Sequence, residues 1–413
     1  MRTLLLGISF LLSIVVAAQR DCRTSEYIDL QKKSTPLFQK KLLEIESFLS
    51  SQSPQLKTLD DKSSGSQPLI RIPVVVHILY NTADQNISDA QIFSQLNALN
   101  RDFRRLNADT VNTPERFHSL AADVQIEFVL ATVDPSGRAT KGIVRRYTSQ
   151  TVFKADDKIK FNSMGGSDAW DTKTYLNIWV GNFQSVIGYS TVPGSSADID
   201  GIVIASQAFG ITNTSSPYNL GRTAVHEAGH WLGLKHIWGD QFCGDDGVDD
   251  TPQQGNFTPG CPATFRTSCN NGILGDMYMN YMDYTNDACV NLFTSGQKER
   301  MRAMFMDGGP RNSLLHSKGL SQPWNLSPEE IIEEYESRVK VYPNPAVSEL
   351  TINLGENWIG SRLSVTDIHG RTIFYFIATS RAQKINLQQL KPGVYFVTGE
   401  NQGSLIRKKF IRL

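Results

Sequence analysis

Residues 226–236 read HEAGHWLGLKH and hold three of the chain's seven histidines. On a helix, His226 and His230 lie four residues apart and share one face, so both imidazoles can reach a single metal ion. Gly233 allows the left-handed conformation in which helices often end, so the chain can turn there and bring His236 back as a third ligand. The segment predicts a helix that stops abruptly beside a metal site.

Three neutral imidazoles form the ligand set of a catalytic zinc ion and leave the fourth position to water. Zinc lowers the pKa of this water, and Glu227 is placed to take its proton during attack on a carbonyl. The simpler alternative is a buried amphipathic helix whose histidines only fill the core. Five specified positions make that alternative the weaker one, and the pattern resembles the metzincin form of the zinc protease motif.

A second motif, NYMDY at residues 280–284, resembles the Met-turn of the pappalysin family within the metzincins. The resemblance implies that Met282 forms a hydrophobic base beneath the zinc ligands. It also implies that Tyr284 directs its hydroxyl at the substrate carbonyl and helps to stabilise the oxyanion. The alternative is a methionine and a tyrosine in ordinary core. The expected fold is an α/β (α+β) metzincin domain with a mixed, twisted sheet above the cleft and an irregular lower half.

Four of the five cysteines fall within residues 243–289, where few strands or helices are predicted. Two disulfides there would stabilise a loop-rich region, and the sequence alone permits three pairings. The resemblance to pappalysins implies the pairs Cys243 with Cys269 and Cys261 with Cys289.

The fifth cysteine, Cys22, stands alone near the N-terminus. A thiolate is a strong zinc ligand, and in several metzincins a prosegment cysteine occupies the water position and silences the zymogen. Pappalysin relatives often carry glycine after this cysteine, whereas Arg23 follows here. We expect Cys22 to bind zinc in the zymogen; the alternatives are a spare thiol and an intermolecular disulfide.

Residues 245–252 read DDGVDDTP and gather four carboxylates around a glycine. Hard oxygen donors at this density suit calcium, although a solvated acidic turn is the alternative. Pappalysins similar to this chain bind calcium in the corresponding loop. That resemblance implies Asp246, Asp250 and Thr251 as contributors to a calcium site.

The segment after the Met-turn helps to build, in metzincins, the pocket for the residue that follows the scissile bond. Asp287 is the only carboxylate of residues 284–289. A carboxylate at the floor of a partly desolvated pocket favours Arg or Lys, and several bacterial pappalysins with similar motifs prefer a basic residue there. The alternatives are that Asp287 faces solvent or helps to bind calcium.

The chain is too long, at 413 residues, for one compact core. Residues 1–18 combine Arg2, an apolar run and small residues, which predicts a cleaved signal peptide. Residues 19–69 are expected to form a prosegment, with a helix over 37–49 and then a polar stretch open to proteolysis. The catalytic domain is expected over 70–317 and a linker over 318–338.

Within the catalytic domain, strands are predicted at residues 71–80, 124–133, 176–180, 187–191 and 201–205. The strand at 187–191 would by resemblance be the sheet edge that binds substrate as an added antiparallel strand. Helices are predicted at 88–107, 219–233 and from a capping box of Thr294 and Gln297 onwards. The first of them carries the apolar stripe Ile92, Leu96, Leu99, Phe103 and Leu106.

Residues 339–413 read as a separate all-β module, an immunoglobulin-like sandwich with strands at 349–354, 363–367, 372–377 and 394–399. Its phrases VYPNP at 341–345 and LKPGVY at 390–395 resemble the C-terminal sorting domain with which Bacteroidetes proteins leave through the type IX secretion machinery. The alternative is a generic binding domain, because sandwich folds serve many functions.

The formal net charge is zero and no basic block stands out, so no nucleic-acid partner is indicated. Beyond the predicted signal peptide, no stretch is apolar enough to span a bilayer. Together the motifs indicate a secreted or cell-surface zinc metalloendopeptidase, exported through the periplasm as a zymogen and acting on polypeptides. The rival interpretation is a surface adhesin with a structural zinc module, which would not need Glu227 and would close the fourth position with a protein ligand.

Overall fold

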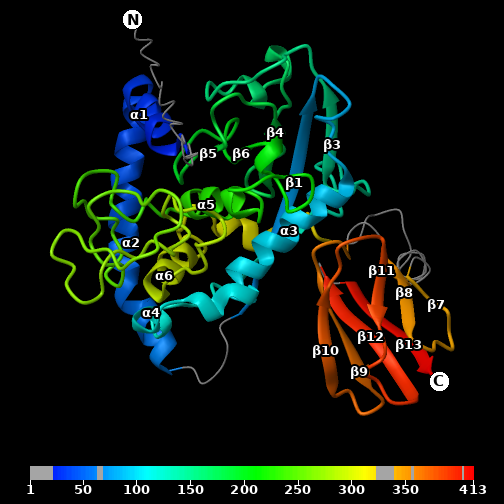
Figure 1. Cartoon of the computed structure of the whole chain (residues 1–413). Coiled ribbons are helices and arrows are strands. Elements are labelled where there is room, and N and C mark those ends of the chain that lie inside the picture. The colour runs from blue at the N-terminus through cyan, green and yellow to red at the C-terminus, as the bar shows by residue number, and fades with distance from the viewer. Residues whose placement is uncertain (1–21, 63–67, 322–338, 355–357, 402–403) are drawn as a thin grey trace, which may run out of the picture.

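The computed structural model describes residues 22–62, 68–321, 339–354, 358–401 and 404–413. The predicted signal peptide and most of the predicted linker lie outside these residues. Among the described residues, no helix is long and apolar enough to cross a membrane. Figure 1 shows a sheet with two helices beneath it, two N-terminal helices along one side, and a separate set of strands near the C-terminus.

The main sheet is mixed, as predicted, with the strand order β2-β1-β4-β6-β5. The central strand β1 (Ile70–Tyr80) pairs in parallel with β4 (Leu176–Gly181) on one side. On its other side, the first half of β1 pairs with β2 (Ile126–Leu130) and the second half with β3 (Ile143–Tyr147). Beyond β4 lie β6 (Ile202–Ala205) and the edge strand β5 (Gly188–Ser190), which runs antiparallel to β6.

Helices α3 (Asp89–Phe103) and α5 (Arg222–Trp231) cover one face of this sheet. Because strand side chains alternate, Ile202 and Ile204 join the core that these helices share. Val203 points to the opposite face, where Trp179 and Tyr189 form a second cluster. The short helix α4 (Glu115–His118) follows α3, and α6 (Ser295–Ala303) follows the irregular lower half. The predicted capping box of Thr294 and Gln297 starts α6.

Helix α3 begins where it was predicted, with the Ser88 hydroxyl accepting from the backbone amide of Gln91. It ends at Phe103, earlier than the predicted residue 107, because Arg105 adopts a positive φ of 48° and turns the chain. The prediction that Leu106 continues the apolar stripe is therefore wrong, since this side chain is 58% exposed.

The N-terminal segment forms two helices, α1 (Thr24–Ser34), which was not predicted, and α2 (Pro36–Lys62). Helix α2 continues well beyond the predicted end at residue 49, so the polar stretch that follows is helical up to Lys62. Ile45 and Phe48 pack against the main core, in which Leu49 is buried. Glu46 forms an ion pair with Arg300 of α6, with 2.5 Å between Oε1 and Nη2.

At the other boundary, residues 318–321 belong to the catalytic domain rather than to the predicted linker. The backbone oxygen of Gly319 accepts from the amide of Thr132 at 2.9 Å, and Ser321 accepts from the Thr132 hydroxyl. These contacts extend the packed domain to Ser321.

The C-terminal module is all-β and has its own core, which starts at Val339. One sheet has the order β10-β9-β12-β13 and the other the order β11-β8-β7. The predicted strands correspond to β8 (Glu349–Asn353), β9 (Arg362–Asp367), β10 (Thr372–Ile377) and β12 (Gly393–Asn401). Three strands were not predicted: β7 (Lys340–Tyr342), β11 (Ala382–Asn386) and β13 (Ser404–Arg412). The module contacts α3, where Asn97 Nδ2 donates to the backbone oxygen of Ile359.

His77 of β1 should make the stability of the fold depend on pH. It is fully buried, stacks on Trp179 and lies within hydrogen-bonding distance of Ser167 and Asn177. Burial lowers its pKa from 6.5 to about 4. Because His77 binds a proton less readily in the folded than in the unfolded protein, the fold keeps its full stability above pH 6.5. As the pH falls from 6.5 towards 4, the free energy of unfolding decreases by about 3 kcal/mol.

We expect urea unfolding at pH 7.5 and pH 4.5 to show a smaller pH dependence for His77→Gln than for the parent. Equal pH dependence in the two proteins would contradict this assignment.

Candidate metal centre and active site

Helix α5 is fixed at both ends by buried contacts. At its start, the Arg222 guanidinium forms ion pairs with Asp102 of α3 and with Asp109, at 3.1 and 2.6 Å. At its end, Gly233 has a φ of 87°, and a Cβ placed there would lie 2.2 Å from Cε of Met304. The positive φ favours a glycine where the chain leaves the helix.

The three predicted ligand histidines converge. Nε2 of His230 lies 3.2 Å from Nε2 of His226 and 3.1 Å from Nε2 of His236. Each Nδ1 faces an acceptor instead, and the acceptors are the backbone oxygens of Tyr281 and Leu234 and the carboxylate of Asp240. In the tautomer that carries its proton on Nδ1, each ring directs the lone pair of its Nε2 at the same point.

Such an arrangement of lone pairs is repulsive unless a cation lies between them. Burial, together with His236, lowers the pKa of His230 to about 3, so the ring stays neutral as a metal ligand must. Asp240 was not predicted from the sequence, although a carboxylate that orients a ligand histidine is a common feature of zinc sites. The donor set fits zinc.

Cys22 joins the histidines at the same point. Its sulfur and one nitrogen from each of His226, His230 and His236 all lie within 4.8 Å of one another, and all four residues are buried. Burial and the nearby Glu227 raise the pKa of the Cys22 thiol well above its ordinary value. Only a strong cation would make this thiol a thiolate.

The residues after Cys22 occupy the sheet edge and the polar atoms around the metal centre. Cys22 pairs in parallel with Gly188 of β5, and the amide of Arg23 donates to the Gly188 oxygen at 3.1 Å. The Thr24 hydroxyl accepts from the amide of Ser190 and donates to Glu227 Oε2 at 2.8 Å. This N-terminal segment therefore blocks the edge strand and the predicted base at once.

Met282 packs directly against helix α5, which carries His226 and His230. A Cβ at Gly229 would come within 2.5 Å of the Met282 sulfur, so the helix approaches the turn this closely only because residue 229 is glycine. The sequence analysis did not single out Gly229. A glycine inside a helix destabilises the helix by about 1 kcal/mol relative to alanine. A glycine at such a position therefore indicates a close contact, and this signal could have identified Gly229.

Tyr284 lies beside the metal centre. The centroid of its ring lies 4.9 Å from the ring centroids of His236 and Trp238. Its hydroxyl donates to the backbone oxygen of Cys22 at 3.0 Å. Burial and the Cys22 and Glu227 groups raise the pKa of Tyr284. The hydroxyl therefore remains a donor.

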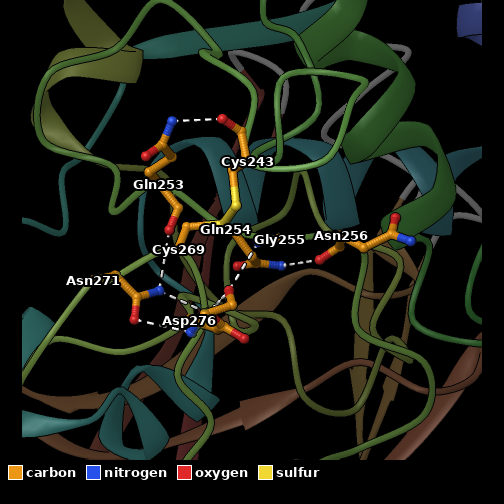
Figure 2. Close-up of a disulfide and its surroundings, with 9 residues drawn as sticks. Cys243, Gln253, Gln254, Gly255, Asn256, Cys269, Asn271 and Asp276 are labelled. Carbon is orange, nitrogen blue, oxygen red and sulfur yellow. Dashed lines mark hydrogen bonds between the residues drawn. A yellow bond between two sulfur atoms is a disulfide. The ribbon is translucent and has the colours of Figure 1, made fainter.

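Disulfides join Cys243 to Cys269 and Cys261 to Cys289, the pairing that the resemblance implied. Figure 2 shows the polar contacts around the first bridge. Gln253 Nε2 donates to the Cys243 oxygen at 2.5 Å, and Asn271 Nδ2 donates both to the Gln253 oxygen and to Asp276. The loop is therefore stabilised by disulfides and by hydrogen bonds of side-chain amides, rather than by the backbone hydrogen bonds of a β-sheet.

The acidic loop brings only part of the predicted calcium set together. The Thr251 hydroxyl lies 2.9 Å from both carboxylate oxygens of Asp246, and burial raises the pKa of Asp246 to about 7. The Asp250 carboxylate instead accepts from Thr294 and from the amide of Gly296 at the start of α6.

Asp287 is buried at the start of α5. Its Oδ2 accepts from the backbone amides of Leu220 and Arg222, at 2.9 and 3.3 Å. The carboxylate thus stabilises the N-terminus of the zinc helix, which the sequence analysis did not foresee.

Two family models match the chain. The model described as pregnancy-associated plasma protein-A matches residues 160–306, and the secretion system C-terminal sorting domain matches residues 340–412. The first match contains the histidine motif and the Met-turn. The second lies within the C-terminal module.

Among solved structures, a mutant of promirolysin from Tannerella forsythia is 44% identical with a TM-score of 0.65, covering 74% of this chain and all of that one. Mature mirolysin from the same organism, in complex with a cleaved peptide, is 49% identical with a TM-score of 0.61, covering 62% of this chain and 100% of that one. An extracellular metalloprotease of Uncinocarpus reesii is 44% identical over 137 residues, or 32% of this chain. The chain spans about half (48%) of that relative's length.

These likenesses and the converging histidines place the chain among metalloproteases with the metzincin fold. It belongs to the pappalysin family of these enzymes and carries a type IX sorting domain at its C-terminus. The protein is therefore a metalloendopeptidase that is secreted or displayed at the cell surface, and the adhesin interpretation is wrong.

Proposed function

We propose that the chain hydrolyses internal peptide bonds with zinc held by His226, His230 and His236. The observation that carries this proposal is the convergence of three Nε2 atoms at 3.1–3.2 Å, with every Nδ1 facing an acceptor. Zinc, when bound, supplies a Lewis acid that polarises the scissile carbonyl and makes water acidic.

Two side chains move or hold protons beside this centre. Glu227 takes a proton from the attacking water and returns it to the leaving amine. Tyr284 donates its hydroxyl to the oxyanion that forms on the substrate carbonyl, because its raised pKa keeps the proton in place. In the zymogen these groups are engaged by Thr24 and by the Cys22 oxygen, respectively.

We further propose that Cys22 fills the fourth zinc position in the zymogen and that residues 19–69 are the prosegment. The bridge between Cys22 and Gly188 is parallel, whereas a substrate is expected to add to β5 in the antiparallel direction. A segment bound in the reverse direction presents its peptide bonds in the wrong orientation for attack, which supports latency without self-cleavage in the cleft.

The remaining organisation is also a proposal. Residues 1–18 act as a signal peptide for export to the periplasm, residues 70–321 hold the catalytic machinery, and the segment that follows joins them to residues 339–413. The two tail sheets enclose one shared core, which supports an immunoglobulin-like sandwich. The type IX secretion machinery is the partner of this tail.

A calcium ion bound in the acidic loop is proposed from the environment of Asp246. Burial raises the pKa of this carboxyl group to about 7, and a hard cation would offset its buried charge. The contact with Thr251 supports these two residues as ligands. It supports Asp250 less, because the oxygens of that carboxylate already accept hydrogen bonds from the start of α6.

The substrate preference is proposed to be Arg or Lys after the scissile bond, with Asp287 as the recognising carboxylate. Asp287 lies in the segment that follows the Met-turn, and a buried carboxylate attracts a basic side chain more strongly than an exposed one does.

We expect the activated enzyme to cleave a peptide library before basic residues and Asp287→Asn to lose this preference by about tenfold or more. Glu115→Gln, an exposed carboxylate on α4, is the matched control. Cleavage of no peptide would refute the proposed function. Cleavage by Asp287→Asn with an unchanged profile would refute only the specificity assignment.

Deleting residues 339–413 should leave the peptidase active and keep it in the periplasm of a type IX secreting host. The physical reason is that the tail has a core of its own and supplies none of the proposed catalytic groups. Cell fractionation with an activity assay measures both effects. Normal appearance of the truncated protein outside the cell would contradict the sorting role.

A further inference from the structure

Tyr27 of α1 inserts its side chain into the catalytic domain on the face of β5 that points away from the zinc helix. The residue is 4% exposed, and its ring lies 5.0 Å from that of Tyr189. Phe153 and Phe183 complete the apolar wall. The Tyr27 hydroxyl donates to the Asp157 carboxylate, with both oxygens at 2.7–2.8 Å.

The floor of this pocket, which we call the Asp157 pocket, is a buried ion pair. Lys160 is fully buried, and its Nζ lies 2.8 Å from Asp157 and donates to the backbone oxygen of Ile199. The same ammonium lies 3.2 Å from the Tyr27 hydroxyl and within 5.5 Å of the ring centroids of Trp179 and Tyr189. A charged pair placed beneath aromatic walls is costly unless it has polar partners. The phenol of Tyr27 supplies one of them.

The Asp157 pocket lies along the path of a substrate. Cys22 stands at the metal centre, the amide of Arg23 donates to Gly188 of β5, and Thr24, the first residue of α1, accepts from Ser190. One residue step and about one helical turn lead from Cys22 to Tyr27 and cover about 9 Å, which is the length of about three residues of an extended chain. A substrate that pairs with β5 in the opposite direction places its N-terminal half on this side of the metal.

We propose that the Asp157 pocket is a substrate subsite for a tyrosine side chain about three residues before the scissile bond, and that the zymogen fills it with its own Tyr27. The inference rests on the proposed function and deepens it. The aromatic walls select a ring, and the Asp157 carboxylate, polarised by Lys160, selects the ring that carries a hydroxyl donor. Removal of the prosegment opens the pocket to the substrate.

The test uses the activated enzyme and a peptide cleaved at a single bond, with Tyr, Phe or Ala at the second, third or fourth position before that bond. At one of these positions, kcat/KM should rise about tenfold from Phe to Tyr, because the hydroxyl gains a hydrogen bond to a charged group. It should also rise severalfold from Ala to Phe. Equal rates for Tyr and Phe at all three positions would overturn the proposal.

Asp157→Asn should remove the advantage of Tyr over Phe, so that the two peptides are cleaved with the same kcat/KM. Asparagine tolerates the left-handed backbone at this position, where φ is 62°. Asp156→Asn, at the exposed neighbouring carboxylate that contacts Lys158, is the matched control and should keep the preference. An unchanged preference in Asp157→Asn would refute the role of this carboxylate.

A second measurement stays informative if Asp157→Asn fails to fold. A synthetic peptide of residues 22–34 with Cys22→Ser should inhibit the activated enzyme, and adding Tyr27→Phe should weaken inhibition about tenfold. Equal inhibition by the two peptides would count against the pocket. The experiment distinguishes the failure of the proposed function from the failure of the subsite. If the chain is not a peptidase, no peptide is cleaved. If only the subsite is wrong, the peptides are cleaved at rates that do not depend on the residue before the scissile bond.

Discussion

Glu227→Ala should lower the rate of peptide hydrolysis by the activated enzyme by about three to four orders of magnitude, because the proposed base for the attacking water is lost. Zinc content should stay at the parent level, since the three histidines and the acceptors of their Nδ1 atoms are unchanged. Glu227 is fully buried beside Gly188, where a Cβ would lie 3.0 Å from Oε1. The carboxylate is therefore held at the sheet edge where a substrate is expected to bind.

The measurement is single-peptide kinetics together with metal analysis of the same samples. Glu115→Ala, at an exposed position of α4, should behave like the parent. A Glu227→Ala protein that binds zinc and retains full activity would show that another group activates the water.

Cys22→Ala should give a zymogen that hydrolyses peptides before its prosegment is cut, at least tenfold faster than the parent zymogen. A contact worth ~1.4 kcal/mol changes the equilibrium constant between the blocked and the open site tenfold, and a thiolate bound to zinc is expected to exceed that value. Latency should not vanish, because Thr24, Tyr27 and α2 still hold the segment against the catalytic domain.

The activity of the uncleaved protein is measured together with the rate of prosegment processing. Ser34→Ala, at the end of α1, is a matched control because it changes a short polar side chain away from the metal centre. A Cys22→Ala zymogen as silent and as intact as the parent would show that steric blockage alone maintains latency.

The convergence of the three histidines could be predicted from the sequence because their geometry is local. Helical spacing fixes His226 and His230, and a glycine fixes the turn that returns His236. The edge strand β5 and the capping box of α6 were likewise encoded in short patterns.

The groups that support the site could not be predicted, because they reach it from distant parts of the chain. Arg222 meets Asp102 across 120 positions, and Asp287 meets the start of α5 across 67. No periodicity links such positions. Asp240 is close to His236 in sequence, but its role depends on the direction of the turn after the zinc helix.

Short or polar elements were missed for a related reason. Strand β3 and the tail strands β7 and β11 are largely exposed, so they lack the apolar alternation that predicts a strand. Helix α1 has few buried residues, and one of them is the Tyr27 that fills the Asp157 pocket. Its folding depends on the surface that it covers, which is invisible in the sequence.

The most direct test of the zinc mechanism is cleavage of a peptide library by the activated protein before and after treatment with a chelator that prefers zinc to calcium. We predict that treatment abolishes cleavage and removes one zinc ion per chain, and that added zinc restores the original cleavage profile. Undiminished cleavage by protein freed of zinc would contradict the proposed role of His226, His230 and His236.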